Sequence, residues 1–63
     1  MKCTVMGAGA WGTALASLLS ENGHQVTLWA YEPDVADSVN AAHENKRFLA
    51  GVPLHQQLQA TSN

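Results

Sequence analysis

Three glycines near the N-terminus constrain the fold of this chain more than any other feature. They form the pattern G-x-G-x-x-G in Gly7-Ala8-Gly9-Ala10-Trp11-Gly12. Residues 2–6 precede the pattern and have the apolar and β-branched composition of a buried strand. A segment with helical periodicity follows, from residue 10 or 11 to Glu21. A strand, a glycine turn and a helix in this order are typical of the start of a βαβ unit.

The helix predicted after the glycines is amphipathic. Its apolar residues recur at helical spacing and form one stripe, which is typical of a helix that faces a core. The stripe consists of Trp11, Ala14, Leu15, Leu18 and Leu19. Asn22-Gly23 ends the helix, because glycine suits the left-handed position that follows a helix C-terminus.

The rest of the chain continues the alternation of strand and helix. Residues 25–31 form a predicted strand with apolar side chains on both faces, so both faces of the sheet are expected to be covered. Pro33 suits the first position of a helix predicted over residues 33–43. Residues 44–53 are expected to be a loop, and residues 58–61 the start of a third strand. This order predicts an α/β fold, a Rossmann-type parallel sheet with βαβα order that forms the incomplete first part of a doubly wound fold.

Composition removes several other classes of protein. Hydrophobic residues make up 46% of the 63 residues and charged residues 13%, unlike a disordered chain. The basic residues are Lys2, Lys46 and Arg47 and the net charge is −2, so no nucleic-acid partner is expected. The lone Cys3 excludes a disulfide framework and fits a cytoplasmic location, and the scattered histidines predict no metal site.

The apolar N-terminal stretch has two alternative interpretations besides a strand and a helix. It is shorter than the roughly 20 apolar residues that a membrane span needs, so no span is predicted. A signal peptide is the other alternative, but glycines at positions 7, 9 and 12 interrupt the stretch and a single lysine precedes it. A dinucleotide-binding unit explains the pattern better.

The glycine motif is a candidate site for a dinucleotide. In such sites the first glycine, here Gly7, allows a tight turn, and the second, Gly9, lets the backbone approach a pyrophosphate. Gly12 allows the helix to pack closely on the strand, and the helix N-terminus offers N–H donors to the phosphates. Glu32 lies 20 positions after Gly12, where its carboxylate would accept hydrogen bonds from the ribose. A 2′-phosphate would meet like charge there, so Glu32 favours NAD over NADP.

Each candidate residue also has a structural alternative. The glycines can be ordinary loop residues, and Trp11 can be a core residue of the helix stripe rather than a neighbour of the cofactor. Tyr31 is either a strand-end aromatic or a ring that lies against adenine. Glu32 is either a charge near a helix N-terminus or the ribose ligand. Lys46-Arg47 is interpreted as a solvated pair rather than a phosphate clamp. The strand, the helix start and the acidic residue at the expected spacing together favour the binding site.

Three stretches of the chain resemble one family. They are residues 6–16 (MGAGAWGTALA), residues 22–29 (NGHQVTLW) and residues 44–54 (ENKRFLAGVPL). The last is similar to a loop that typically reads N-x-R-[YF]-L-P-G-[IV]-x-L in that family. Together they resemble the start of bacterial NAD(P)-dependent glycerol-3-phosphate dehydrogenases, over essentially the whole chain.

The resemblance implies an oxidoreductase of phospholipid biosynthesis that interconverts sn-glycerol 3-phosphate and dihydroxyacetone phosphate with NAD or NADP. Residues 1–63 are then the N-terminal part of the dinucleotide-binding domain, and the substrate domain is absent from them. The family's catalytic lysine lies in a later segment that neither Lys2 nor Lys46 matches. No catalytic residue, and no turnover by these residues alone, is therefore expected. The resemblance leaves a homodimer open.

By position, the resemblance also places Ala10, Trp11 and Tyr31 at the cofactor. Members often have serine in place of Ala10 and arginine or histidine in place of Tyr31, and the missing cation weakens the grip on a 2′-phosphate. Ala50 replaces a common proline, with little expected consequence. The predicted cofactor-binding residues are Gly7, Gly9, Ala10, Trp11, Gly12, Tyr31 and Glu32.

Two other functions stay open from the sequence. The chain can be the NAD(H)-binding segment of another dehydrogenase, of hydroxy-acid or ketopantoate type. The loop that contains Phe48 favours the glycerol-3-phosphate family over these. The chain can also be a non-catalytic nucleotide-binding module, which requires that it fold alone, and a core is marginal at this length.

Overall fold

Three parallel strands and two helices alternate along the chain in a computed structural model that describes residues 1–63. The elements are β1 (Lys2–Met6), α1 (Ala10–Glu21), β2 (Gln25–Trp29), α2 (Pro33–Ala42) and β3 (Gln59–Thr61). The strands form one sheet in the order β1-β2-β3. The predicted Rossmann-type α/β fold is therefore confirmed. Neither helix has the length and apolar character that crossing a membrane requires.

The boundaries of the elements differ slightly from those predicted. Strand β2 ends at Trp29 rather than Tyr31, because the chain turns before Glu32, whose extended backbone (φ −95°, ψ 126°) leads into Pro33. Helix α2 ends one residue early, because His43 adopts a left-handed conformation with φ of 53°. Strand β3 begins at residue 59 rather than 58.

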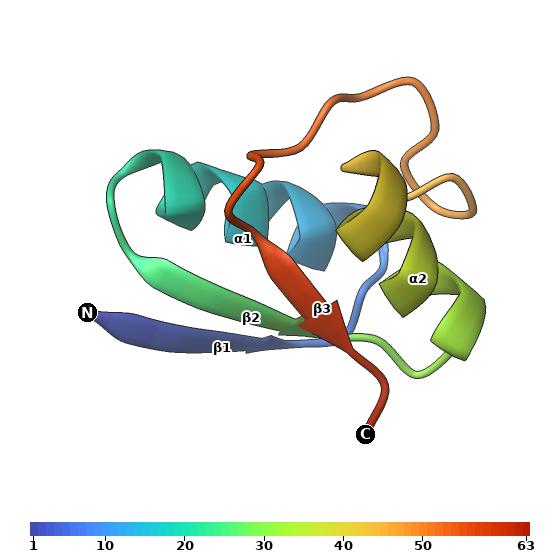
Figure 1. The fold of residues 1–63 in the computed structure, drawn as a ribbon, viewed down its shortest axis with the longest axis horizontal. Helices are drawn as coiled ribbons and strands as arrows, with labels where there is room; N and C mark the ends of the chain where they lie inside the picture. Colours follow the sequence, from blue (N-terminus) through green and yellow to red (C-terminus); the bar gives the residue numbers. More distant parts are fainter.

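Both helices cover the same face of the sheet (Figure 1). The two connections run in the same direction along the sheet, and right-handed crossovers then place their helices on one side. The side chains of Val26 and Leu28 are buried under the helices, whereas Met6 on the opposite face is exposed. On this opposite face of β2, Thr27 and Trp29 are half-buried, and neither helix of residues 1–63 lies over them.

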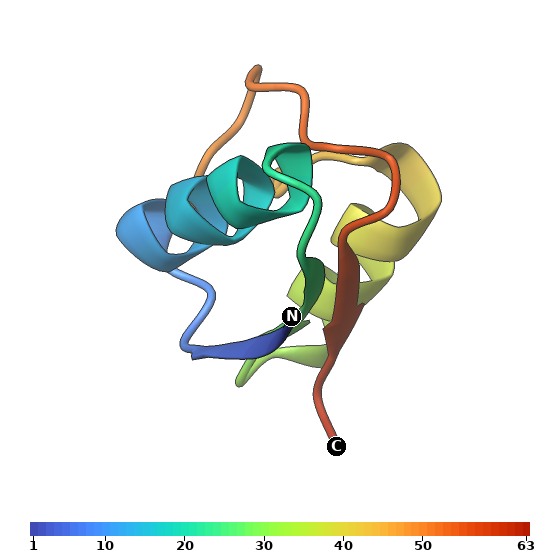
Figure 2. The same ribbon diagram turned by 90° about the vertical axis from the view of Figure 1, so that its left-hand side faces the viewer.

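The core lies between the sheet and the two helices. The segment from residue 43 to residue 58 runs over the helices, on the side away from the strands, before it returns to the sheet (Figures 1 and 2). This segment adds two leucines to the core. The buried apolar residues are Ala8, Ala16, Val26, Leu28, Ala30, Val35, Ala36, Val39, Leu54, Leu58 and Ala60.

Helix α1 turns most of its apolar stripe away from the core. Its buried residues are Thr13, Ala16, Ser17 and Ser20. Of the predicted stripe, Leu19 packs against the core, whereas Trp11, Ala14, Leu15 and Leu18 are exposed. The buried face has small side chains, and the helix starts very close to the preceding loop. The close approach of α1 to the rest of the fold therefore requires small residues on its buried face. The interpretation of Trp11 as a core residue is wrong for this structure.

A side chain closes the outer edge of β3. Asn40 in α2 donates its amide N–H to the carbonyl oxygen of Ala60 and accepts the Ala60 N–H, each at 2.8 Å. These bonds take the place of those that a further strand would form. The free edge of the sheet is therefore that of β1, which has β2 as its one neighbour.

Candidate functional site

The residues predicted to bind a cofactor gather at the carboxyl ends of β1 and β2. Gly7 follows β1 directly, and its N–H donates to the carbonyl oxygen of Trp29 at 2.9 Å. The parallel register places Met6 opposite Trp29. The glycine loop and the Tyr31–Glu32 turn therefore leave the sheet side by side. This edge of a parallel α/β sheet is where such folds bind their ligands.

The three glycines of the motif differ in what surrounds them. Gly7 has a φ of +103°, which L side chains rarely adopt, so it forms the tight turn. A Cβ on Gly12 would lie 2.1 Å from the carbonyl oxygen of Gly7, so this position tolerates no side chain. A Cβ on Gly9 would meet no protein atom within 4 Å. The protein leaves the space beside Gly9 open, and this fits a site where phosphates approach the backbone.

The N-terminus of α1 has no protein partner for its donors. Gly9 occupies the N-cap position, no side chain caps the helix, and the first turn holds no acidic residue. Thr13 N–H is the first to donate backward, to the carbonyl oxygen of Gly9 at 3.0 Å. The N–H groups of residues 10–12 precede that bond and lack helical partners. Ala10 and Trp11 in this turn are exposed, Trp11 to 90%. The positive end of the helix dipole and these N–H groups suit an anion.

A buried side chain from a distant loop holds the glycine loop in place. Asn45 is fully buried, and its amide nitrogen lies 2.8 Å from the Ala8 carbonyl oxygen and 2.9 Å from the Thr13 hydroxyl. The Thr13 hydroxyl in turn donates to the same Ala8 carbonyl at 3.3 Å. The Asn45 side-chain oxygen accepts the N–H of Phe48 at 3.0 Å. The loop after α2 is thereby fastened to the glycine loop, a role for Asn45 that no sequence pattern indicated.

The turn after β2 is more open. Tyr31 is 77% exposed, and its ring meets the ring of Trp29 edge-on with centroids 6.0 Å apart. Glu32 is half-buried at the N-cap of α2, where its side chain forms no capping hydrogen bond. The one ion pair of the structure involves other residues. The Glu32 carboxylate is therefore available to a ligand, as a ribose-binding residue must be.

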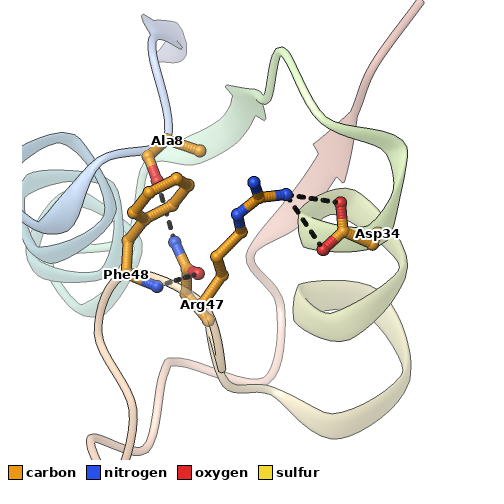
Figure 3. Close-up of polar contacts among 5 residues, drawn as sticks. Ala8, Asp34, Arg47 and Phe48 are labelled. Atoms are coloured by element: carbon orange, nitrogen blue, oxygen red, sulfur yellow. Dashed lines mark hydrogen bonds and ion pairs between the residues drawn. The ribbon is translucent and has the colours of Figure 1, made fainter.

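Arg47 reaches the same edge of the sheet from the loop after α2 (Figure 3). Its Nη1 lies 3.3 Å from Oδ1 of Asp34, which belongs to the first turn of α2. Its guanidinium carbon lies 5.4 Å from the centroid of the Phe48 ring. Figure 3 shows the Arg47 side chain between Asp34 and the Phe48 ring. Arg47 is exposed, as expected of a solvated residue, and it also forms an ion pair that joins the loop after α2 to the first turn of that helix.

Comparison with known proteins gives a consistent family. Residues 2–63 match the family described as NAD-dependent glycerol-3-phosphate dehydrogenase N-terminus. A glycerol-3-phosphate dehydrogenase (NAD(P)+) from Bacillus cytotoxicus is 50% identical over 62 residues, 98% of this chain and 18% of that protein. One from Hyphomonas neptunium is 55% identical over 58 residues, 92% of this chain and 17% of that protein.

Solved structures agree with the sequence relatives. A glycerol-3-phosphate dehydrogenase from Coxiella burnetii superposes with a TM-score of 0.86 at 40% identity, over 98% of this chain and 19% of that one. The enzyme from Saccharomyces cerevisiae gives a TM-score of 0.88 at 30% identity, over 100% of this chain and 22% of that one. The chain thus spans about a fifth of the length of these relatives.

Proposed function

Because the chain belongs to the family of NAD-dependent glycerol-3-phosphate dehydrogenase N-termini, we propose that it is the cofactor-binding segment of such an enzyme. The complete enzyme interconverts sn-glycerol 3-phosphate and dihydroxyacetone phosphate. Bound NAD or NADP supplies the hydride acceptor or donor. Residues 1–63 form the first part of the dinucleotide-binding domain, and the substrate domain and catalytic groups belong to the rest of the enzyme. The lone cysteine is in keeping with an enzyme of the cytoplasm.

One observation in the structure carries the cofactor-binding role: the open space beside Gly9 at the uncapped N-terminus of α1. The pyrophosphate would bind there, held by the unpartnered N–H groups of Ala10, Trp11 and Gly12. The carboxylate of Glu32, at the end of the neighbouring strand, binds the adenosine ribose. The exposed rings of Trp11 and Tyr31 would be free to contact the cofactor. This chain's residues bind and orient the cofactor, and none of them moves a proton.

The decisive test is Gly9→Val in the complete enzyme. The protein itself leaves room for the new side chain, and the backbone of Gly9 (φ −69°, ψ −177°) is one that valine adopts readily. The variant should therefore fold, while its side chain occupies the place of the pyrophosphate. Titration of intrinsic fluorescence with NADH should show at least about a hundredfold loss of affinity, the scale of several lost charge-assisted hydrogen bonds.

Ala42→Val is the matched control, because it adds a similar side chain at an exposed position at the far end of α2. It should leave the NADH affinity unchanged. A folded Gly9→Val enzyme that binds NADH normally would contradict the placement of the site. If the unmodified enzyme oxidised NADH with ketopantoate but not with dihydroxyacetone phosphate, the alternative dehydrogenase would replace the proposed one.

A further inference from the structure

We propose that Arg47 is the residue that allows this site to accept a 2′-phosphate, by exchanging the carboxylate of Asp34 for the phosphate of NADP. This inference rests on the proposed function and concerns the ribose end of the same site. Glu32 and Asp34 both bring negative charge to the start of α2, and Tyr31 brings none. A 2′-phosphate bound there needs a cation, and an arginine near the acidic residue is the usual means.

Arg47 is placed to serve that end of the site. Its partner Asp34 lies two residues after Glu32, in the same turn of α2. The loop that carries Arg47 is fastened to the glycine loop through Asn45, so the position of its backbone is fixed relative to the pyrophosphate site. The Phe48 ring supports the guanidinium from the other side. Lys2, by contrast, lies at the opposite end of β1.

The ion pair with Asp34 is weak and therefore exchangeable. A single nitrogen, Nη1, faces both carboxylate oxygens, at 3.3 and 3.5 Å. Strong charge-assisted bonds are nearer ~2.8 Å and use the guanidinium as a fork. The two side chains are 52% and 65% exposed, and pairs as exposed as this contribute little to stability.

A phosphate is a better partner for Arg47 than Asp34 is. It carries more charge than a carboxylate and presents oxygens that match the fork of the guanidinium. The N-terminus of α2 adds favourable potential for an anion. With NAD bound, the 2′-position carries a neutral hydroxyl, so Arg47 stays with Asp34 and Glu32 binds the ribose. With NADP bound, Arg47 turns to the phosphate.

The test compares Arg47→Ala with Lys46→Ala in the complete enzyme, with circular dichroism to establish that both fold. The two variants lose the same charge at adjacent exposed positions. Dissociation constants are measured by calorimetry for NADPH and NADH, and for the fragments 2′,5′-ADP and 5′-ADP. Arg47→Ala should reduce the affinity for NADPH at least about tenfold more than the affinity for NADH, which is the effect of losing one charge-assisted hydrogen bond. Lys46→Ala should change that ratio by less than about twofold, because solvent and salt screen its charge.

Asp34→Asn tests the exchange itself. It should raise NADPH affinity, and the increase should shrink when Arg47→Ala is also present. An equal increase in both backgrounds would show that Asp34 acts by repulsion alone and would overturn the exchange. An equal loss of NADH and NADPH affinity in Arg47→Ala would assign Arg47 to the pyrophosphate and overturn the proposal. Failure of the unmodified enzyme to bind NADH would instead contradict the proposed function.

Discussion

The two halves of the candidate site are held in different ways. The phosphate half, residues 7–13, is fixed by the fully buried Asn45 and by a helix start too close for a side chain at Gly12. The ribose half, residues 31–34 with Arg47, consists of largely exposed side chains and one loose ion pair. The pyrophosphate is common to NAD and NADP, whereas the ribose carries the group that differs. The fold itself therefore forms the part of the site that is common to both cofactors, and replaceable surface residues form the part that distinguishes them.

The largest effect should come from Gly12→Ala in the phosphate half. Helix propensity alone predicts a gain of about 0.5–1 kcal/mol from alanine. The new Cβ would instead lie 2.1 Å from a backbone oxygen, which cannot move without opening the turn at Gly7. We expect a net loss of at least about 2 kcal/mol in the free energy of unfolding, measured by calorimetry without cofactor.

Gly9→Ala is the control for that substitution, because it makes the same chemical change three residues earlier. Its Cβ meets no atom, so the clash expected at Gly12 is absent. The entropy effect on the unfolded state and the poorer capping by alanine at the N-cap oppose each other, and the stability should stay within about 1 kcal/mol. If the two alanine variants had equal thermal midpoints, the phosphate half would not be held by close packing as described.

A smaller effect is expected from Asn45→Ala. The substitution leaves the Phe48 N–H without its side-chain partner and the Ala8 carbonyl with the Thr13 hydroxyl alone, which should cost about 1–2 kcal/mol of stability. Because the glycine loop is no longer held by Asn45, the affinities for NADH and NADPH should fall by the same factor. Asn40→Ala is the matched control, since Asn40 also bonds the backbone twice but at β3. It should lower the stability and leave both affinities unchanged. A change in the ratio of NADH affinity to NADPH affinity in Asn45→Ala would contradict the division of the site into a phosphate half and a ribose half.

The fold was predictable from local signals. The glycine turn, Gly23 after α1 and Pro33 at the start of α2 mark the ends of elements, and each works through backbone geometry that the sequence determines directly. The burial of α1 was not predictable in this way. Periodicity shows that a stripe of a helix is apolar, but not what covers that stripe. In residues 1–63 the face of α1 with small side chains is buried, while Leu15 and Leu18 stay exposed.

The candidate site was predictable from the sequence where its residues have a fixed spacing in the glycine motif or from it, as the glycines and Glu32 do. The glycine spacing locates the phosphate half, because Gly7 needs its positive φ and Gly12 has no room for a side chain. Asn45 and Arg47 depend on contacts with residues 37 and 13 positions away in the sequence. A buried amide in a loop has no periodic pattern, and an arginine in a polar loop looks the same whether or not it is ion-paired. Their roles become visible only when the loop is placed over the sheet edge.

The smallest structural effect, and the one that sharpens the comparison most, is expected from Tyr31→Arg combined with Glu32→Ala. Neither side chain is buried, and neither forms a hydrogen bond or ion pair in the structure. The free energy of unfolding should therefore stay within about 0.5 kcal/mol of that of the unmodified enzyme, and the thermal midpoint should change little. The double change removes a carboxylate that repels a 2′-phosphate and adds a cation that attracts one. The NADPH/NADH affinity ratio should rise at least about tenfold, the scale of one charge-assisted hydrogen bond, in a titration with each cofactor. An unchanged ratio would mean that this turn does not bind the ribose. A large loss of stability would mean that the ribose half, too, is part of the folded framework.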